Sequence, residues 1–424
     1  MVDALNIQSF LRLGYFIDFD EIWQPIDFSR IDTNTYNDVG TEDLLILGQR
    51  CFDESIDALF ESGRDHVVPI SGGLDSRIIL AALLERTEAA NLHTYTFGVP
   101  GCYDLEIGSQ VAQAIGTRHH AFSFRHLNYH RDELTDVANR TGRQAVLFHH
   151  PPVWALDRLL GGCRIWSGYV GDAVAGSHLH DPPSESLDAA KRLHLRSRTF
   201  VRSTRLFTAD DDALVSRMGG GRQDPRQLSW DEQVLFDEAV AKFTAPLVLF
   251  RGFEYLTPLI NSPWMDFMFS VPAEHRLGQR LMIDIARRAY SRLFDLPSKN
   301  RLGHHFDTSA PRIRAKFWAN RARKLAHRFI PAVNYPNHQY NDFNEAIRSS
   351  PNARELIRSC VSDLEKRAVV DWIDMEALWR RHDARLANHG DALVVLASLE
   401  LVLSARDSAR DCAAPRPVHS ADGP

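Results

Sequence analysis

A glycine-rich turn that begins at residue 71 carries the side chains best suited to chemistry. It follows the short apolar run 67–70 and precedes the apolar stretch 78–84, which predicts a helix. Paired glycines let the backbone come close to a ligand, and the free N–H groups at the start of a helix attract anions, phosphate above all. The turn consists of Ser71, Gly72, Gly73, Leu74, Asp75 and Ser76. This pattern predicts a phosphate-binding loop.

Asp75 places a carboxylate inside this predicted anion site. Two like charges would repel each other unless Mg²⁺ lies between them, since Mg²⁺ binds carboxylate and phosphate oxygens together. No Gly-Lys-Ser/Thr follows, so the loop is not of the Walker type. Two adjacent glycines alone would favour an ordinary turn. The longer pattern Ser-Gly-Gly-Leu-Asp-Ser, placed between a strand and a helix, favours a binding site.

Residues 71–76 resemble the pyrophosphate loop of the N-type ATP pyrophosphatases, and in particular that of the asparagine synthetase-like amide ligases. The resemblance runs in motif order over roughly residues 50–405, with strong identity only in this first loop. It implies that ATP and Mg²⁺ bind here. In the family the end of the second strand holds adenine and ribose through backbone groups. The implied nucleotide contacts, besides the loop, are Ile70, Phe97, Gly98 and Gly168.

A second motif at residues 167–176 resembles the family's Ser-Gly-Glu-Gly-Ala-Asp-Glu-Leu-Phe-Gly segment. Ser167, Gly168, Asp172 and Gly176 match it, while Ala173 replaces the second Glu. Asp172 falls where the family has its second Mg²⁺-binding carboxylate, so the resemblance implies Asp75 and Asp172 as metal ligands. Taken alone, Asp172 would be better explained as a turn residue that accepts local backbone N–H groups.

Tyr169 replaces the first Glu of that motif. Relatives that close β-lactam rings carry Tyr at this place and pair it with a Glu from the next motif to deprotonate the attacking nitrogen. Here the next motif begins at Glu254, which implies a Tyr169–Glu254 base, because a phenol alone is a poor base at neutral pH. The alternative for Tyr169 is an aromatic packing residue. Leu256 and Asn261 depart from the family's Arg and Asp, so the usual substrate is in doubt.

A loop at residues 296–303 looks like the family's Leu-Pro-Lys loop, in which a lysine touches the phosphates or the charge that develops in the second step. Lys299 is the candidate for this role and Arg301 is its rival.

The elements that must position these residues follow one another as strand, helix, strand, helix, strand. Strands are predicted at 67–70, 92–98 and 119–124, with helices between them. This order is typical of an α/β fold with a doubly wound, mostly parallel sheet and helices on both faces. A helical C-terminal portion is expected to follow. Ligands in such sheets bind beyond the carboxyl ends of the strands.

The expected organisation is a linker-like segment at 1–50, a ligase domain at 51–408 with a helical insertion at 177–228, and a disordered tail at 409–424. Residue 2 is Val2 and the phosphate loop comes only about seventy residues into the chain. The glutaminase domain of asparagine synthetases, whose nucleophile is a cysteine at position 2, is therefore expected to be absent.

Composition indicates a globular protein of 424 residues, with 44% hydrophobic residues, 25% charged residues and a formal net charge of −6. Five widely spaced cysteines favour a reducing compartment, and no apolar run is long enough to span a bilayer. A cytoplasmic location is expected. Residues 276–328 hold fourteen Lys or Arg and three Asp. This basic segment could contact nucleic acid or steer an anionic substrate, but a solvated helix face is the preferred explanation. No nucleic-acid partner is expected.

The function expected from these features is ATP-dependent amide-bond formation. The enzyme would adenylate a small-molecule, sugar-acid or peptide carboxylate, release pyrophosphate and transfer the acyl group to ammonia or an amine. Ammonia could come from a separate glutaminase, and the chain could form a homodimer. Alternatives are a peptide or β-lactam-type macrocyclase, and a degenerate ATP-binding partner subunit. A tRNA-thiolation enzyme shares the loop, but this chain lacks the CxxC motif that is usual there.

Overall fold

The computed structural model describes residues 2–19, 21, 23–124, 129–224, 226–329 and 339–413. Five parallel strands form one sheet in the order β3-β2-β1-β4-β5. They are β1 (His66–Pro69), β2 (Leu92–Gly98), β3 (Arg118–Ser123), β4 (Arg164–Trp166) and β5 (Glu254–Leu256). The strand order reverses between β1 and β4, and ligands in open α/β sheets bind at such a point. The predicted α/β class is confirmed.

Alternating residues of the short central strands face opposite sides of the sheet. Val68 and Trp166 belong to the largest apolar core, together with α3 (Asp75–Leu84) and α2 (Thr41–Asp57). Val67 and Ile165 pack on the other face against α6 (Val153–Leu160). Both faces of β1 and β4 are therefore buried, as expected for parallel strands rich in apolar residues.

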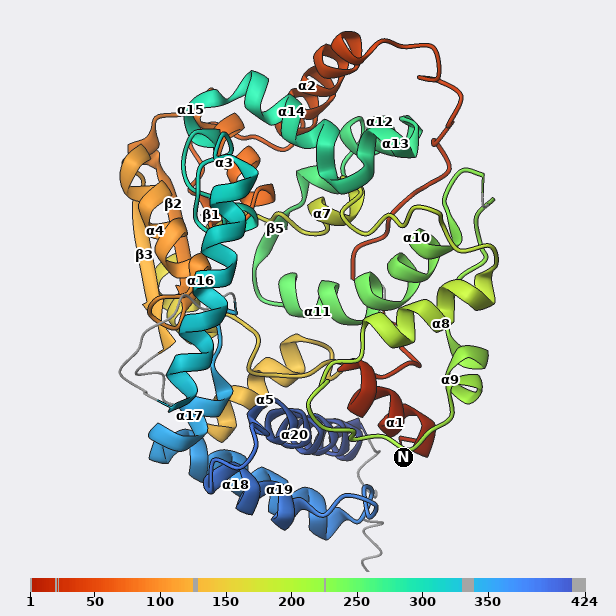
Figure 1. The fold of residues 1–424 in the computed structure, drawn as a ribbon, viewed down its shortest axis with the longest axis vertical. Helices are drawn as coiled ribbons and strands as arrows, with labels where there is room; N and C mark the ends of the chain where they lie inside the picture. The colour runs from red at the N-terminus through yellow and green to blue at the C-terminus, as the bar shows by residue number, and fades with distance from the viewer. Residues whose placement is uncertain are drawn as a thin grey trace, which may run out of the picture.

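The C-terminal helical portion gathers below the sheet in the view of Figure 1, where it is drawn in blue. It comprises α17 (Phe343–Ser349), α18 (Pro351–Arg367), α19 (Met375–Asp383) and α20 (Gly390–Ala413). The helix α20 supplies much of a second core, in which Leu393, Leu396 and Leu399 are fully buried. Because α20 continues to Ala413, the first residues of the expected tail are helical, and residues 414–424 lie outside the described part.

The first helix, α1 (Ala4–Leu13), belongs to the same second core. Ile7, Phe10 and Leu11 are buried there beside α20, and Arg406 of α20 lies 4.3 Å from the ring centroid of Phe16. Residues 1–50 thus include a helix built into the C-terminal portion (Figure 1). The expected insertion contains α8 (Leu187–Ser197) and α9 (Asp211–Arg217), which pack on Leu13 and Tyr15 through a third apolar cluster.

The long helix α16 (Ala310–Phe329) runs past the sheet next to α4 (Tyr103–Ile115), as Figure 1 shows in teal. Asn320 of α16 donates a hydrogen bond to the Tyr103 hydroxyl at 3.1 Å. Among the described residues, no helix combines the length and the apolar character needed to cross a bilayer. Cys51, Cys102, Cys163 and Cys360 are all free thiols.

Candidate active site

The predicted phosphate loop lies at the carboxyl end of β1, where the sequence placed it. Ile70 extends the strand pairing, because its N–H donates to the Tyr95 carbonyl at 2.8 Å. Two serine hydroxyls of the turn stabilise its backbone by hydrogen bonds. Ser71 Oγ accepts the Gly73 N–H at 3.1 Å, and Ser76 Oγ accepts the Ser71 N–H at 3.4 Å. The helix α3 begins at Asp75, within the turn, so its first N–H groups face the loop.

Glycines of the second motif allow the two loops to touch. A Cβ atom at Gly168 would lie 3.0 Å from the Asp75 Cβ. A Cβ atom at Gly171 would lie 2.9 Å from the Asp75 Cγ and 2.3 Å from Leu259 Cδ1. A larger residue at Gly168 would press on Asp75, and one at Gly171 would displace its carboxylate. The loop after β4 therefore packs directly on the carboxylate of the first loop.

Asp75 and Asp172 lie together at this contact. Burial and the negative charge of Asp172 raise the pKa of Asp75 to about 8, although the charge of Lys299 acts in the opposite direction. Oδ1 of Asp75 is buried and has no hydrogen-bond partner among the described residues. A buried carboxylate oxygen without a partner is costly unless a cation or a donor occupies the space beside it.

Asp172 is better satisfied than Asp75. Its Oδ1 accepts the Ala173 N–H at 2.9 Å, and its Oδ2 lies 3.2 Å from His178 Nε2. Burial alone would raise the pKa of Asp172, but the hydrogen bond and the charge of His178 bring it below its ordinary value. Within the described ranges no group of three or more His, Cys, Asp or Glu could hold a metal ion. Two carboxylates, one with an orphaned oxygen, suit Mg²⁺ that takes its other ligands from water and phosphate.

Lys299 lies over the first loop. Its N–H donates to the Gly72 carbonyl at 2.9 Å, and a Cβ atom on Gly72 would come within 3.0 Å of the Lys299 Cβ. Its ammonium lies 2.9 Å from Oδ1 of Asp104, the same oxygen that accepts the Gly72 N–H at 3.1 Å. Arg301, the rival of Lys299, instead lies 5.9 Å from the ring centroid of Phe306.

The end of β2 lies beside the loop, as the strand order requires. Gly98 is the last residue of β2, and the next N–H, that of Val99, donates to the Tyr340 carbonyl at 2.8 Å. The Phe97 ring lies between Phe124, stacked at 5.6 Å between centroids, and Tyr340, perpendicular at 5.4 Å. Phe97 and Gly98 are thus placed on the strand next to the loop, and an aromatic cluster surrounds Phe97.

Tyr169 and Glu254 do not come together. Glu254 is the first residue of β5 and pairs with Arg164, the first residue of β4, whereas Tyr169 follows the carboxyl end of β4. Tyr169 lies in the turn between β4 and α7 (Gly171–Val174), at the opposite end of β4 from Arg164. Glu254 accepts a hydrogen bond from Arg164 Nε at 2.7 Å and is 3.6 Å from Arg64. Tyr169 is buried in the main core, and burial raises the pKa of its hydroxyl. This geometry corrects the expectation of a paired base.

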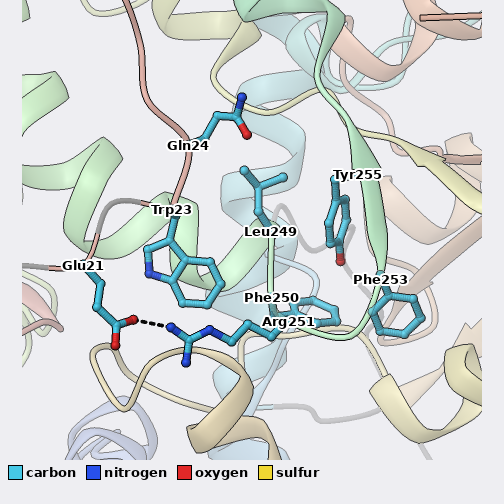
Figure 2. Close-up of a pocket in the computed structure, with 8 residues that line it drawn as sticks. All are labelled: Glu21, Trp23, Gln24, Leu249, Phe250, Arg251, Phe253 and Tyr255. Atoms are coloured by element: carbon cyan, nitrogen blue, oxygen red, sulfur yellow. Dashed lines mark hydrogen bonds and ion pairs between the residues drawn. The ribbon is translucent and has the colours of Figure 1, made fainter.

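A separate cavity of about 330 Å³ lies near Glu254, at the amino end of β5. Figure 2 shows the ion pair between Glu21 and Arg251 at its edge, and the Trp23 ring beside the Arg251 guanidinium. The remaining lining residues are Gln24, Leu249, Phe250, Phe253 and Tyr255. None of the predicted site residues lines it, so this cavity is distinct from the loop site.

Comparison with known proteins establishes the family to which the chain belongs. The family model described as asparagine synthase matches residues 49–404. The chain belongs to the asparagine synthase family. The match begins before the phosphate loop and ends within α20, so this family's domain includes the sheet, the insertion and the C-terminal helices. The loops that carry Asp75, Asp172 and Lys299 all lie inside it.

Individual family members resemble parts of the chain. The glutamine-hydrolyzing asparagine synthetase 2 of Arabidopsis thaliana is 46% identical over 126 residues, which cover 27% of this chain and 22% of that protein. Asparagine synthetase B of Escherichia coli is 30% identical over 165 residues, 34% of this chain and 29% of that protein. The enzyme of Triphysaria versicolor is 25% identical over 257 residues, 51% and 43% respectively. The chain therefore spans less than half the length of these relatives.

Two residues that contact the loops were not predicted from the sequence motifs. They are Asp104 and His178. Asp104 lies in the first turn of α4, and its carboxylate links Gly72 to Lys299. Its sequence signal is an acidic residue at a helix start, which ordinary helix capping also explains. His178 follows the second motif and contacts Asp172, a position for which spacing offers no signal.

Proposed function

We propose that the chain is an ATP-dependent amide ligase, which activates a carboxylate as an acyl-adenylate and transfers the acyl group to nitrogen. The observation that carries the proposal is the buried Oδ1 of Asp75, which has no partner among the described residues and lies where the second loop brings Asp172 beside it. A glycine-rich turn, a helix start and an ammonium converge around these carboxylates. That combination suits a polyphosphate held through a divalent cation.

In the proposed first step a carboxylate oxygen attacks the α-phosphorus of ATP and the bond to pyrophosphate breaks. The leaving group gains negative charge, which preorganised donors stabilise. The N–H groups at the start of α3 and the Lys299 ammonium are these donors, since the N–H groups of Ser71, Gly72 and Gly73 already donate to side chains of the protein. Mg²⁺ held by Asp75 and Asp172 would neutralise the phosphate charge.

The second step needs a neutral nitrogen nucleophile. A protonated amine would require a base, but the structure separates Tyr169 from Glu254 and buries Tyr169. This geometry favours ammonia, because a larger fraction of it is the neutral base at neutral pH than of an alkyl amine such as a lysine side chain, which depends more on a protein base. The nitrogen source is thus proposed to be ammonia, either free or from a separate glutaminase. The carboxylate is a small-molecule, sugar-acid or peptide acid.

The test is release of AMP and pyrophosphate from ATP, with and without ammonium, across a panel of aspartate, uronic acids and acidic peptides. One acid is expected to raise AMP release and to yield the amide only when ammonium is present. Asp75→Asn is expected to abolish the reaction, whereas Asp188→Asn on the exposed side of α8 should leave it unchanged. If AMP release with every acid equals that of Asp75→Asn, the proposal is wrong.

A second candidate is an ATP-binding partner subunit without turnover. The observation that favours it is Leu256, which takes the place of the family's Arg and is buried in the core rather than presented to a ligand. Magnesium-dependent ATP binding by calorimetry, with no AMP formed from any acid, would support this candidate and exclude the ligase.

A further inference from the structure

The helix α16 exposes an apolar stripe to solvent. Trp318 and Leu325 are each 62% exposed, and Phe317 is 48% exposed. Each residue turns an α-helix by about 100°, so positions 311, 315, 318, 322 and 325 lie on one face. These residues are Pro311, Ala315, Trp318, Ala322 and Leu325, and every one of them is exposed. The usual amphipathic arrangement is thus reversed, because the apolar stripe faces water.

The opposite face holds α16 on the protein. Ile313, Lys316 and Asn320 are half-buried there. Asn320 binds the Tyr103 hydroxyl, and a Cβ atom on Gly303 would lie 3.5 Å from the Lys316 ammonium. The helix is therefore already formed and fixed, and the stripe gains no burial from the described part of the chain.

Arginines flank the stripe on both sides. Arg314 and Arg321 lie along one edge, and Arg312 and Arg323 lie beyond the other. None of the four forms an ion pair with another described residue, although the Arg321 guanidinium lies 5.7 Å from the Trp318 ring centroid. The sequence of α16 contains seven Lys or Arg and no Asp or Glu. An exposed apolar stripe between rows of cations requires a partner that is anionic at its surface and apolar beneath.

We propose that α16 docks on an anionic lipid bilayer, with its axis parallel to the membrane plane. Trp318 and Leu325 would enter the boundary between headgroups and acyl chains, and the flanking arginines would reach the lipid phosphates. A helix of this kind lies on the membrane rather than crossing it. Because Tyr103, the α16 partner, also lies beside Gly72, docking would hold the phosphate loop close to the membrane surface.

Two other partners fit less well. Nucleic acid would pair with the arginines, but phosphate contacts would leave the exposed leucine, which lies in line with the tryptophan, in water. A second copy of this chain would have to bring four more arginines to the same surface, and like charges repel. An anionic lipid surface satisfies both the stripe and its cations.

The experiment is co-sedimentation of the full chain with phosphatidylcholine vesicles, with and without one-third phosphatidylglycerol. Binding is expected only to the anionic vesicles and should weaken as salt is raised. The double variant Trp318→Ser with Leu325→Ser should lower the partition constant at least about tenfold. The control Ile46→Ser with Leu386→Ser, at exposed apolar positions elsewhere, should bind like the parent.

Three outcomes would overturn the proposal. One is equal binding of neutral and anionic vesicles, or none. Another is binding to anionic vesicles that the stripe variant does not weaken. The third is a different partner in the absence of vesicle binding. That partner would be either homopolymeric RNA, bound in a way that requires Arg314 and Arg321, or a second copy of the chain, in a dimer that Trp318→Ser with Leu325→Ser dissociates. Circular dichroism of each variant separates unfolding from lost docking, and the ligase activity in solution is measured independently.

Discussion

Oδ1 of Asp104 joins two parts of the site that lie far apart in sequence. It accepts the Gly72 N–H at 3.1 Å and lies 2.9 Å from the Lys299 ammonium. Asp104 is itself held in place, because the Thr96 hydroxyl donates to its backbone carbonyl at 3.0 Å. The ammonium over the phosphate loop is thus positioned by a carboxylate on the neighbouring strand-to-helix connection.

Removing the charge of Asp104 should free Lys299 from this position. Asp104→Asn is expected to lower kcat about 10- to 100-fold, because misplacing a group that stabilises charge costs on this order. Lys299→Met should cost about 100- to 1,000-fold. If Asp104 acts through Lys299, the double variant should lose little more than Lys299→Met alone. Losses that multiply would show that Asp104 acts independently of Lys299.

Gly171 is the place where the second loop touches Asp75. A Cβ atom there would lie 2.3 Å from Leu259 Cδ1 and 2.9 Å from the Asp75 Cγ. Gly171→Ala is expected to lower the free energy of unfolding by about 1–3 kcal/mol and to weaken magnesium-dependent ATP binding. Gly40→Ala is the control, since its Cβ would meet only an Asp43 oxygen at 4.0 Å. Urea unfolding and calorimetry measure the two effects separately.

Glu254 should be a structural residue. It is half-exposed and paired with Arg164 at the amino end of the sheet. Glu254→Gln is expected to leave kcat within about twofold of the parent and to lower stability by up to about 1 kcal/mol, because the Glu254 carboxylate is half-exposed and the buried Arg164 keeps Glu61 as a partner at 3.1 Å. If Glu254→Gln lowered kcat well beyond twofold while the variant stayed folded, Glu254 would have a role in the reaction.

Stability should fall in mild acid because buried histidines resist protonation. Burial lowers the pKa of His150 and of His382 to about 4, and both side chains are almost fully buried. The unfolded chain binds these protons near pH 6.5, so each histidine lowers stability progressively as pH falls from about 6.5 to 4. The loss is on the order of 3 kcal/mol per residue at most. Chemical denaturation between pH 7 and 4 measures it, and His150→Phe should flatten the slope.

The sequence predicted the elements whose signal is local. The apolar run before Ser71, the glycine pair and the helix after it all belong to one short stretch, and the structure has them in the predicted order. The alternation of strands and helices predicted a parallel sheet, which the structure confirms. Local pattern is informative here because neighbouring residues determine both the turn and the helix start.

Relationships between distant residues could not be predicted in this way. Glu254 matched a family motif, but strand pairing with Arg164 places it at the amino end of β5. The contact of Asp104 with Lys299 depends on how two loops pack. In the basic segment 276–328, Tyr290, Phe294 and Phe306 are buried, whereas Phe317 and Trp318 are exposed, and only the packed fold distinguishes the two groups.

The packing of α1 on α20 has a consequence for how the protein is made. A ribosome that has synthesised α1, which ends at Leu13, must add more than three hundred residues before it reaches α20, which begins at Gly390. Until then Phe10 and Leu11 lack their partners on α20, and incompletely buried apolar surfaces bind chaperones or aggregate. The second core can therefore close only after α20 has been synthesised, and until then its apolar surface on α1 is exposed to misfolding.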